Sequence, residues 1–278
     1  MSAKRLYISA DIEGVGGVAT QAHTTPAGFE YQQAREWMTA EVLAACEAAF
    51  AQGVEEVVVS DSHGNGQSLI IDKLPDNVQV IRSWPRPLCM MEGVDIGDYV
   101  GALLIGYHSG ASDMRGVLAH TLHGGAISEV RLNGEVASET VISAATAAHF
   151  GVPLIMVSGC DAYIEHAQTV LPGVEGVVTK WACSRTSARM IKPSIVQQNI
   201  ADGVTAALTR LDSFSANRLP DNIETEIVCK NRLGAELFAY LPNVDQVDAH
   251  TIKFVGKDMV EVSKFLQFAI SSGALTPK

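Results

Sequence analysis

Asp11 and Glu13 are two carboxylates separated by one residue, directly after an apolar run that starts at Leu6. In an extended segment, residues two positions apart point to the same face, so these carboxylates would lie side by side. Two neighbouring anions repel each other unless a cation lies between them. The pair therefore indicates either a bound metal ion or two solvated loop acids, and this motif alone favours neither.

Two histidines stand at the ends of later apolar runs: His63 follows residues 55–61, and His108 closes residues 100–108. The carboxyl ends of parallel strands meet at one edge of an open α/β sheet, where ligands bind. A single histidine at such a place is usually a hydrogen-bonded structural residue. Two histidines and two acids at three strand ends favour a metal site, and imidazole and carboxylate ligands without cysteine indicate zinc or a related divalent ion.

Glu139 and His120 could join this site, and each has a structural alternative. Glu139 falls in the first turn of an expected helix, where the helix dipole favours a carboxylate and Ser138 could cap the helix. Ligation and this capping role agree equally well with the sequence. His120 ends the short apolar run 117–120 and is either functional or structural, whereas the structural role is favoured for His123.

The glycines after Glu13 offer a competing interpretation, because residues 14–19 match the Gly-x-Gly-x-x-Gly/Ala pattern of dinucleotide-binding folds. In those folds the glycine turn opens directly into a helix whose N-terminus binds the pyrophosphate. Here the helical pattern starts only near Phe29, after Pro26 and Gly28. The sequence therefore disfavours a dinucleotide site.

Cys160 supports a second enzyme hypothesis. It follows the apolar run 153–158 and precedes an expected helix, a position where the pKa of a thiol falls. A cysteine amidohydrolase would use such a thiol as its nucleophile. The common structural role is a small buried residue at a strand–helix junction. A protein that binds metal and peptide without turnover is the alternative that is not an enzyme.

These residues require a scaffold of the α/β class. Apolar runs of strand length alternate with segments of helical period, which predicts a largely parallel central sheet with flanking helices. The expected strands are residues 6–11, 55–61, 78–82, 100–108, 117–120 and 153–158. The expected helices are residues 29–50, 138–150, 162–170, 193–211 and 257–272. A hairpin is expected over residues 129–136, because Asn133-Gly134 favours the positive φ angles of a type I′ turn.

A soft domain boundary is expected near residue 213. Residues 213–222 are rich in Ser, Asn and Pro, as linkers often are. We expect residues 1–212 to form a metal-binding catalytic α/β domain and residues 213–278 to form a smaller C-terminal α/β element. The 278 residues, 47% of them hydrophobic, suffice for a large buried core in one or two domains.

The composition restricts the partners and the compartment. The net charge of -11 disfavours nucleic acid, whose binding proteins present Lys and Arg surfaces. The sequence has neither a signal-peptide core nor an apolar stretch that could span a bilayer, so no membrane partner is expected. Five scattered cysteines without a Cys-x-x-Cys pair fit reduced thiols, and a cytoplasmic location is expected.

Together these motifs resemble the zinc-dependent D-aminopeptidases of bacterial dipeptide-permease operons. The most specific segments are residues 9–14, 61–63, 106–108 and 116–120, and the resemblance extends from Tyr7 to residues 257–259. It implies two zinc ions per chain with Asp11 as the bridging ligand. The implied remaining ligands are Glu13, His63, His108 and Glu139.

The resemblance also implies an activity and an assembly. It implies an aminopeptidase that hydrolyses the N-terminal residue of short peptides or amides, such as D-Ala-D-Ala, with a metal-activated water and with His120 as the catalytic histidine. Ring-shaped decamers are typical of the family, so the same homo-oligomer is implied here. Met114-Arg115 stands where a Thr-Pro-like turn is common in the family, which leaves the substrate preference open.

Overall fold

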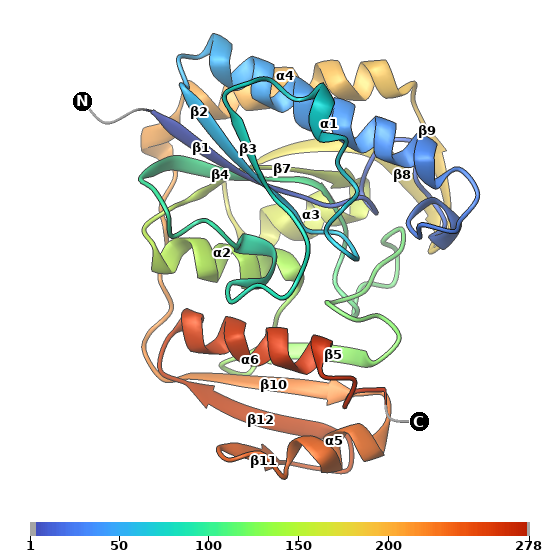
Figure 1. Cartoon of the computed structure of the whole chain (residues 1–278), viewed down its shortest axis with the longest axis vertical. Coiled ribbons are helices and arrows are strands. Elements are labelled where there is room, and N and C mark those ends of the chain that lie inside the picture. Colours follow the sequence, from blue (N-terminus) through green and yellow to red (C-terminus); the bar gives the residue numbers. More distant parts are fainter. Residues whose placement is uncertain (1–3, 277–278) are drawn as a thin grey trace.

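The computed structural model describes residues 4–276 and contains two sheets, a larger one of seven strands and a smaller one of five. The larger sheet has helices on both faces, and the smaller sheet lies below it (Figure 1). This arrangement confirms the expected α/β class with a largely parallel central sheet.

The larger sheet is parallel except at one edge, where its last two strands pair antiparallel. Its strands are β1 (Arg5–Ala10), β2 (Glu56–Asp61), β3 (Val78–Ile81), β4 (Tyr99–Tyr107), β7 (Leu154–Cys160), β8 (Glu175–Ser184) and β9 (Ser187–Met190). One face is covered by α1 (Tyr31–Ala51) and α4 (Pro193–Leu208), and the other by α2 (Glu139–His149) and α3 (Asp161–Val170) (Figure 1). Coverage of both faces explains why the strands β1, β2, β4 and β7 are largely apolar and buried.

The strand order of the larger sheet is β3-β2-β1-β4-β7-β8-β9. The chain therefore proceeds from β1 to one side and then crosses to β4 on the other side, so the order reverses between β1 and β4. In open α/β sheets ligands bind outside the carboxyl ends of the strands at this reversal. Asp11 follows β1 and His108 follows β4 at this place.

Two glycines let the ends of β1 and β4 approach each other closely. The amide of Gly14 donates a hydrogen bond to the carbonyl of Gly106 at 2.7 Å. A Cβ atom on Gly14 would lie 1.9 Å from the carbonyl oxygen of Tyr107. A Cβ atom on Gly106, whose φ is 72°, would lie 2.3 Å from the carbonyl oxygen of Asp11. Side chains larger than hydrogen at these two positions would separate the strand ends that carry the candidate site.

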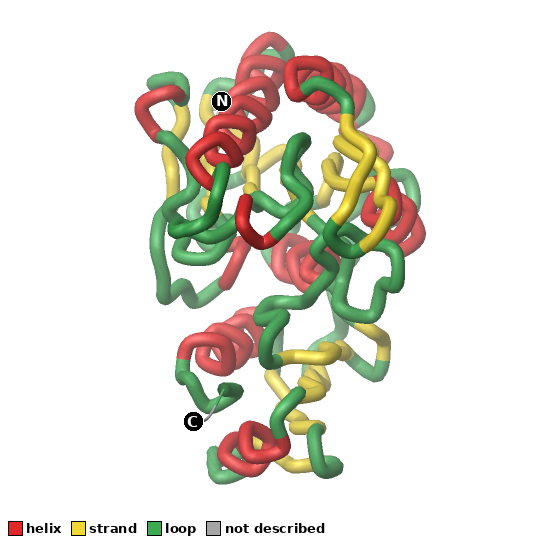
Figure 2. Tube along the Cα trace, turned by 90° about the vertical axis from the view of Figure 1, so that its right-hand side faces the viewer, coloured by secondary structure: helices red, strands yellow, loops and turns green. Residues whose placement is uncertain are grey.

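The smaller sheet is antiparallel and has the order β11-β12-β10-β5-β6. Its strands are β5 (Ile127–Leu132), β6 (Glu135–Val136), β10 (Ile223–Cys229), β11 (Val244–Gln246) and β12 (Thr251–Gly256). Helix α5 (Arg232–Phe238) contacts β10, β11 and β12, while α6 (Met259–Ser271) lies between this sheet and α2 (Figure 1). Figure 2 shows the same separation of the two sheets from the side.

The smaller sheet is not formed by residues 213–278 alone, because β5 and β6 come from the earlier part of the chain. The division between the sheets therefore does not coincide with the expected boundary near residue 213, and the division into domains stays a prediction. The β5–β6 hairpin itself confirms the turn prediction, since Asn133 and Gly134 have φ angles of 51° and 85°.

Residues 117–120 do not form the expected strand. Val117 and Leu118 are buried, which produces a strand-like pattern, but Leu118 has a φ of 53° and the segment lies in a loop. The amide of Leu118 donates instead to the carbonyl of Arg185, in the turn between β8 and β9, at 2.8 Å.

The strands β8 and β9 were not expected from the sequence, and the expected helix at residues 193–211 ends at Leu208. Within the described residues, no helix combines the length and the apolar content needed to cross a membrane.

Candidate metal centre

All six residues expected at the site lie together at the carboxyl ends of β1, β2 and β4. They form two groups of three, and within each group one ligand atom per residue lies within 4.8 Å of the others. The groups are Asp11, Glu13 and His63, and His108, His120 and Glu139. His123, for which a structural role was favoured, belongs to neither group.

Asp11 lies between the two groups. Its Oδ1 atom is 3.2 Å from Nδ1 of His63, and its Oδ2 atom is 3.3 Å from Nε2 of His108. The side chain is buried, with 4% of the residue exposed. Asp11 therefore contacts one histidine of each group, one with each carboxylate oxygen.

Glu13 contacts His63, and Glu139 contacts His108. Oε2 of Glu13 is 2.9 Å from Nδ1 of His63, and Oε1 of Glu139 is 3.4 Å from Nε2 of His108. Glu139 begins α2, and the expected cap is confirmed because Oγ of Ser138 accepts a hydrogen bond from the amide of Val141 at 3.4 Å. The start of α2 therefore holds Glu139 beside His108.

Each of the three histidines is oriented by a main-chain carbonyl. The contacts are Nε2 of His63 to Thr24 at 2.7 Å, Nδ1 of His108 to Ser109 at 2.9 Å, and Nδ1 of His120 to Leu118 at 2.9 Å. A ring N–H that donates to a carbonyl leaves the other ring nitrogen available to bind a metal ion. For His63 and His108 this other nitrogen faces the carboxylates.

The charges of the site determine the protonation of its side chains. Burial lowers the pKa of His108, but the charges of Glu139 and Asp11 outweigh burial and raise this pKa to about 10. Burial also lowers the pKa of His63, and Glu13 and Asp11 nevertheless hold it well above its ordinary value. Burial raises the pKa of Asp11, yet His108 and His63 hold it well below its usual range. Asp11 and the two imidazoles therefore stabilise each other's charged forms.

Two atoms of the site indicate that a cation belongs there. Oε2 of Glu13 and Nε2 of His108 are buried and form no hydrogen bond of normal geometry with any of residues 4–276. Buried polar atoms are normally hydrogen-bonded, so these two atoms point to a missing ligand. The donors are nitrogen and oxygen atoms without a thiolate, a set that fits zinc or a related divalent ion.

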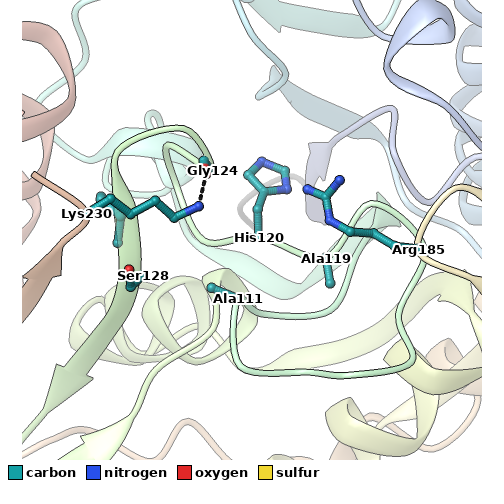
Figure 3. Close-up of a pocket in the computed structure, with 8 residues that line it drawn as sticks. Ala111, Ala119, His120, Gly124, Ser128, Arg185 and Lys230 are labelled. Atoms are coloured by element: carbon teal, nitrogen blue, oxygen red, sulfur yellow. Dashed lines mark hydrogen bonds between the residues drawn. The ribbon is translucent and has the colours of Figure 1, made fainter. Parts of the chain in front are cut away.

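His120 differs from the other two histidines because it lines an open cavity of about 290 Å³ (Figure 3). Its ring stacks on the ring of His108, with the centroids 4.0 Å apart and the planes at 11°. Leu118 and Leu122, two positions before and two positions after His120, have left-handed φ angles of 53° and 60°. Such a backbone costs about 1–3 kcal/mol per residue and is concentrated at functional sites. The loop therefore presents His120 to a ligand in the cavity.

Lys180 is a residue of the site that the sequence analysis did not identify. Lys180 belongs to β8. Its Nζ atom donates hydrogen bonds to the carbonyls of Glu13, Val15 and Val18 at 2.5, 2.9 and 2.6 Å. Lys180 is fully buried, and burial lowers its pKa to about 8. These contacts hold the loop after Glu13. A lysine inside an apolar run was the available signal, but the sequence does not show which loop it contacts.

The structure argues against the two competing interpretations of the sequence. The glycine segment does not open into a helix, because α1 begins only at Tyr31, and the amide of Gly16 donates to Oε1 of Glu41 at 2.7 Å. This part of the described chain therefore lacks the glycine turn and helix of a dinucleotide site, as the sequence analysis predicted. Cys160 ends β7 with 1% of the residue exposed, so a substrate does not reach its thiol.

Comparisons with known proteins point to one family. A family model described as D-aminopeptidase matches residues 4–268. A D-aminopeptidase from Bacillus subtilis (strain 168) is 29% identical over 258 residues, which are 92% of this chain and 93% of the relative. The solved structure of the zinc-dependent D-aminopeptidase DppA from Bacillus subtilis, a self-compartmentalizing protease, superposes with a TM-score of 0.93 at 27% identity and covers 99% of both chains.

The fold, the donor set and these matches define a hydrolase of the metallo-aminopeptidase class. Because the family model spans residues 4–268, this chain belongs to the D-aminopeptidase family. The family expected from the sequence motifs is thereby confirmed.

We predict that His108 of the metal-free protein carries both ring protons near neutral pH, because its pKa is about 10 instead of 6.5. Since this pKa is higher in the folded than in the unfolded chain, protonation of His108 stabilises the fold fully below about pH 6.5, and this contribution is lost as the pH rises through about 10. An NMR titration of the imidazole nitrogens measures it. Glu139→Gln should lower the pKa of His108, and a neutral imidazole near neutral pH in the unsubstituted protein contradicts the prediction.

Proposed function

We propose that this protein is a zinc-dependent D-aminopeptidase that removes the N-terminal residue from short peptides or amides, with D-Ala-D-Ala as a representative substrate. One observation carries the proposal: each of three histidines donates a hydrogen bond from one ring N–H to a main-chain carbonyl, and two of them turn the other ring nitrogen to buried carboxylates. The zinc dependence of the related Bacillus subtilis structure and the family membership support it.

The proposed site would hold two zinc ions per chain, with Asp11 as the ligand common to both. The remaining ligands are Glu13, His63, His108 and Glu139. Bound zinc supplies a Lewis acid that polarises a carbonyl group and lowers the pKa of water to near neutrality. The position of Asp11 between His63 and His108 supports this assignment.

The side chains of the chain itself bind the substrate and move its protons. His120 shares its Nδ1 proton with the carbonyl of Leu118, so Nε2 is the atom that accepts a proton from, or returns a proton to, the reacting groups. Its place in the cavity wall gives it access to the scissile bond. A carboxylate of the site would pair with the free amine of the substrate, which limits cleavage to the N-terminal residue.

A ring-shaped homo-oligomer, a decamer as in the family, is part of the proposal. The related DppA is described as a self-compartmentalizing protease, which supports assembly and a short-peptide substrate.

All five cysteines are free in the structure, as expected for reduced thiols, and a cytoplasmic location stays a prediction. A metal-dependent peptide-binding protein without turnover remains the alternative, and no contact in the site favours it.

Asp11→Ala is expected to lose most of both zinc ions. The substitution removes the one carboxylate that contacts a histidine in each of the two groups. Elemental analysis of the purified variant measures the zinc content per chain. Asp212→Ala, which removes an exposed acid far along the sequence, is the matched control and should retain its zinc. Full zinc occupancy in Asp11→Ala would exclude Asp11 as a ligand.

His120→Ala is expected to retain zinc and to lose turnover by about 100-fold to 10,000-fold, the usual effect of removing a general acid or base. Elemental analysis and kcat measured on the same preparation separate the two effects. His149→Ala, at the end of α2, is the control for the loss of an imidazole elsewhere. Because His120 also belongs to the group with His108 and Glu139, loss of zinc together with activity would make it a ligand and refute the assignment.

D-Ala-D-Ala is expected to be cleaved roughly 100-fold faster than L-Ala-L-Ala, because the opposite configuration moves the side chain to a different wall while the amine and carbonyl are held. N-acetyl-D-Ala-D-Ala should not be cleaved, since its blocked amine cannot pair with a carboxylate. Rates of amino-acid release at one zinc concentration test both statements. Equal rates on all three peptides would eliminate the D-aminopeptidase function.

A further inference from the structure

The cavity beside His120 carries two cationic side chains in a protein whose net charge is -11. It is lined by Ala111, Ala119, His120, Gly124, Ile127, Ser128, Arg185 and Lys230. No aspartate or glutamate is among these lining residues of the described chain. Figure 3 shows His120 between the two cations, with Arg185 on one side and Lys230 on the other. A concentration of positive charge in an acidic protein favours an anionic ligand.

Arg185 lies in the turn between β8 and β9, and its side chain is directed toward His120 (Figure 3). Its carbonyl accepts a hydrogen bond from the amide of Leu118 at 2.8 Å, which ties the turn to the loop of His120. Within residues 4–276 the guanidinium of Arg185 forms no ion pair, whereas those of Arg131 and Arg210 pair with carboxylates. The main chain therefore positions Arg185, and its guanidinium is free to bind a ligand.

Lys230 reaches the cavity from the smaller sheet, immediately after β10. Its Nζ atom donates to the carbonyl of Gly124 at 2.6 Å, which holds the side chain across the cavity wall (Figure 3). An ammonium group has three donors, so two remain for a ligand. No ion pair of Lys230 with a carboxylate occurs in the described part of the chain.

We propose that Arg185 and Lys230 bind the C-terminal carboxylate of a short peptide while His120 faces the scissile bond. This inference rests on the proposed aminopeptidase function. A planar guanidinium binds a carboxylate through two parallel hydrogen bonds, and an ammonium adds a third. In a dipeptide the carboxylate lies one residue beyond the scissile bond, so one small cavity can hold both groups.

The size of the cavity agrees with this substrate. Its volume of about 290 Å³ is at the lower limit of ligand pockets, which span roughly 300–1,000 Å³. A cavity of this size holds the second residue of a dipeptide, and its two cations favour a free carboxylate there over a blocked one.

The test compares kcat/KM of the zinc-loaded enzyme for D-Ala-D-Ala and for its C-terminal amide. The unsubstituted enzyme should prefer the free acid by about 10-fold to 100-fold, the range expected for hydrogen bonds between charged groups. Arg185→Ala should abolish most of this preference, because kcat/KM should fall much more for the free acid than for the amide. The loss should reside mainly in KM, because the carboxylate is bound alike in the ground state and the transition state.

Matched variants separate the anchor from a general effect on the fold. Arg189→Ala changes an arginine of the same hairpin that stacks on Trp181 at 4.2 Å and does not line the cavity, so the preference should persist. Arg185→Lys keeps the charge and should restore part of the preference. Lys230→Ala should reduce the preference in the same direction as Arg185→Ala.

The possible results distinguish this inference from the function on which it rests. If Arg185→Ala lowers kcat/KM equally for both peptides, or leaves the preference intact, the carboxylate anchor is wrong and the aminopeptidase function stands. If the unsubstituted enzyme cleaves neither peptide, the proposed function is wrong and the anchor falls with it.

Discussion

The rest of the structure depends on one interaction: the buried carboxylate of Asp11 forms ion pairs with His63 and His108. Buried charges cost several kcal/mol unless opposite charges and hydrogen bonds compensate them. The charge of Asp11 is compensated only if the ends of β1, β2 and β4 bring the two histidines to it. The close approach of Gly14 and Gly106 permits this arrangement of β1 and β4. The parallel register of these strands and the crossing of the chain from one side of β1 to the other are therefore conditions for the chemistry.

The two sheets contribute different parts of the site. The larger sheet supplies the buried carboxylates and histidines, and Lys180 holds the loop that carries Glu13. The cavity outside this centre has walls from three separate segments: the loop of His120, the β8–β9 turn and the smaller sheet. The carboxylates and His108 are consequently buried, whereas His120 and Arg185 in the cavity wall lie on loops, where substitution is tolerated more easily.

The sequence predicted those features that depend on neighbouring residues. Apolar runs that end in Asp11, His63 and His108 identify strand ends, and parallel strand ends meet, so the cluster could be anticipated without coordinates. The Asn133-Gly134 turn was predicted for the same local reason. Contacts between distant segments were not accessible. The segment 117–120 is a short apolar run in the sequence, but its backbone is left-handed at Leu118. The partners of Lys180 and Arg185 depend on strand order, which local patterns do not encode.

The discontinuous origin of the smaller sheet has a consequence for synthesis on the ribosome. Strand β5 lies between β6 and β10, and β10 belongs to a segment that emerges much later than β5. Until then β5 has an exposed edge, and the adjoining loop of His120 and the start of α2 lack the support of the smaller sheet. The larger sheet can form earlier from its own strands. The cavity beside His120, whose wall includes Lys230 directly after β10, is therefore complete only once β10 has emerged and paired with β5.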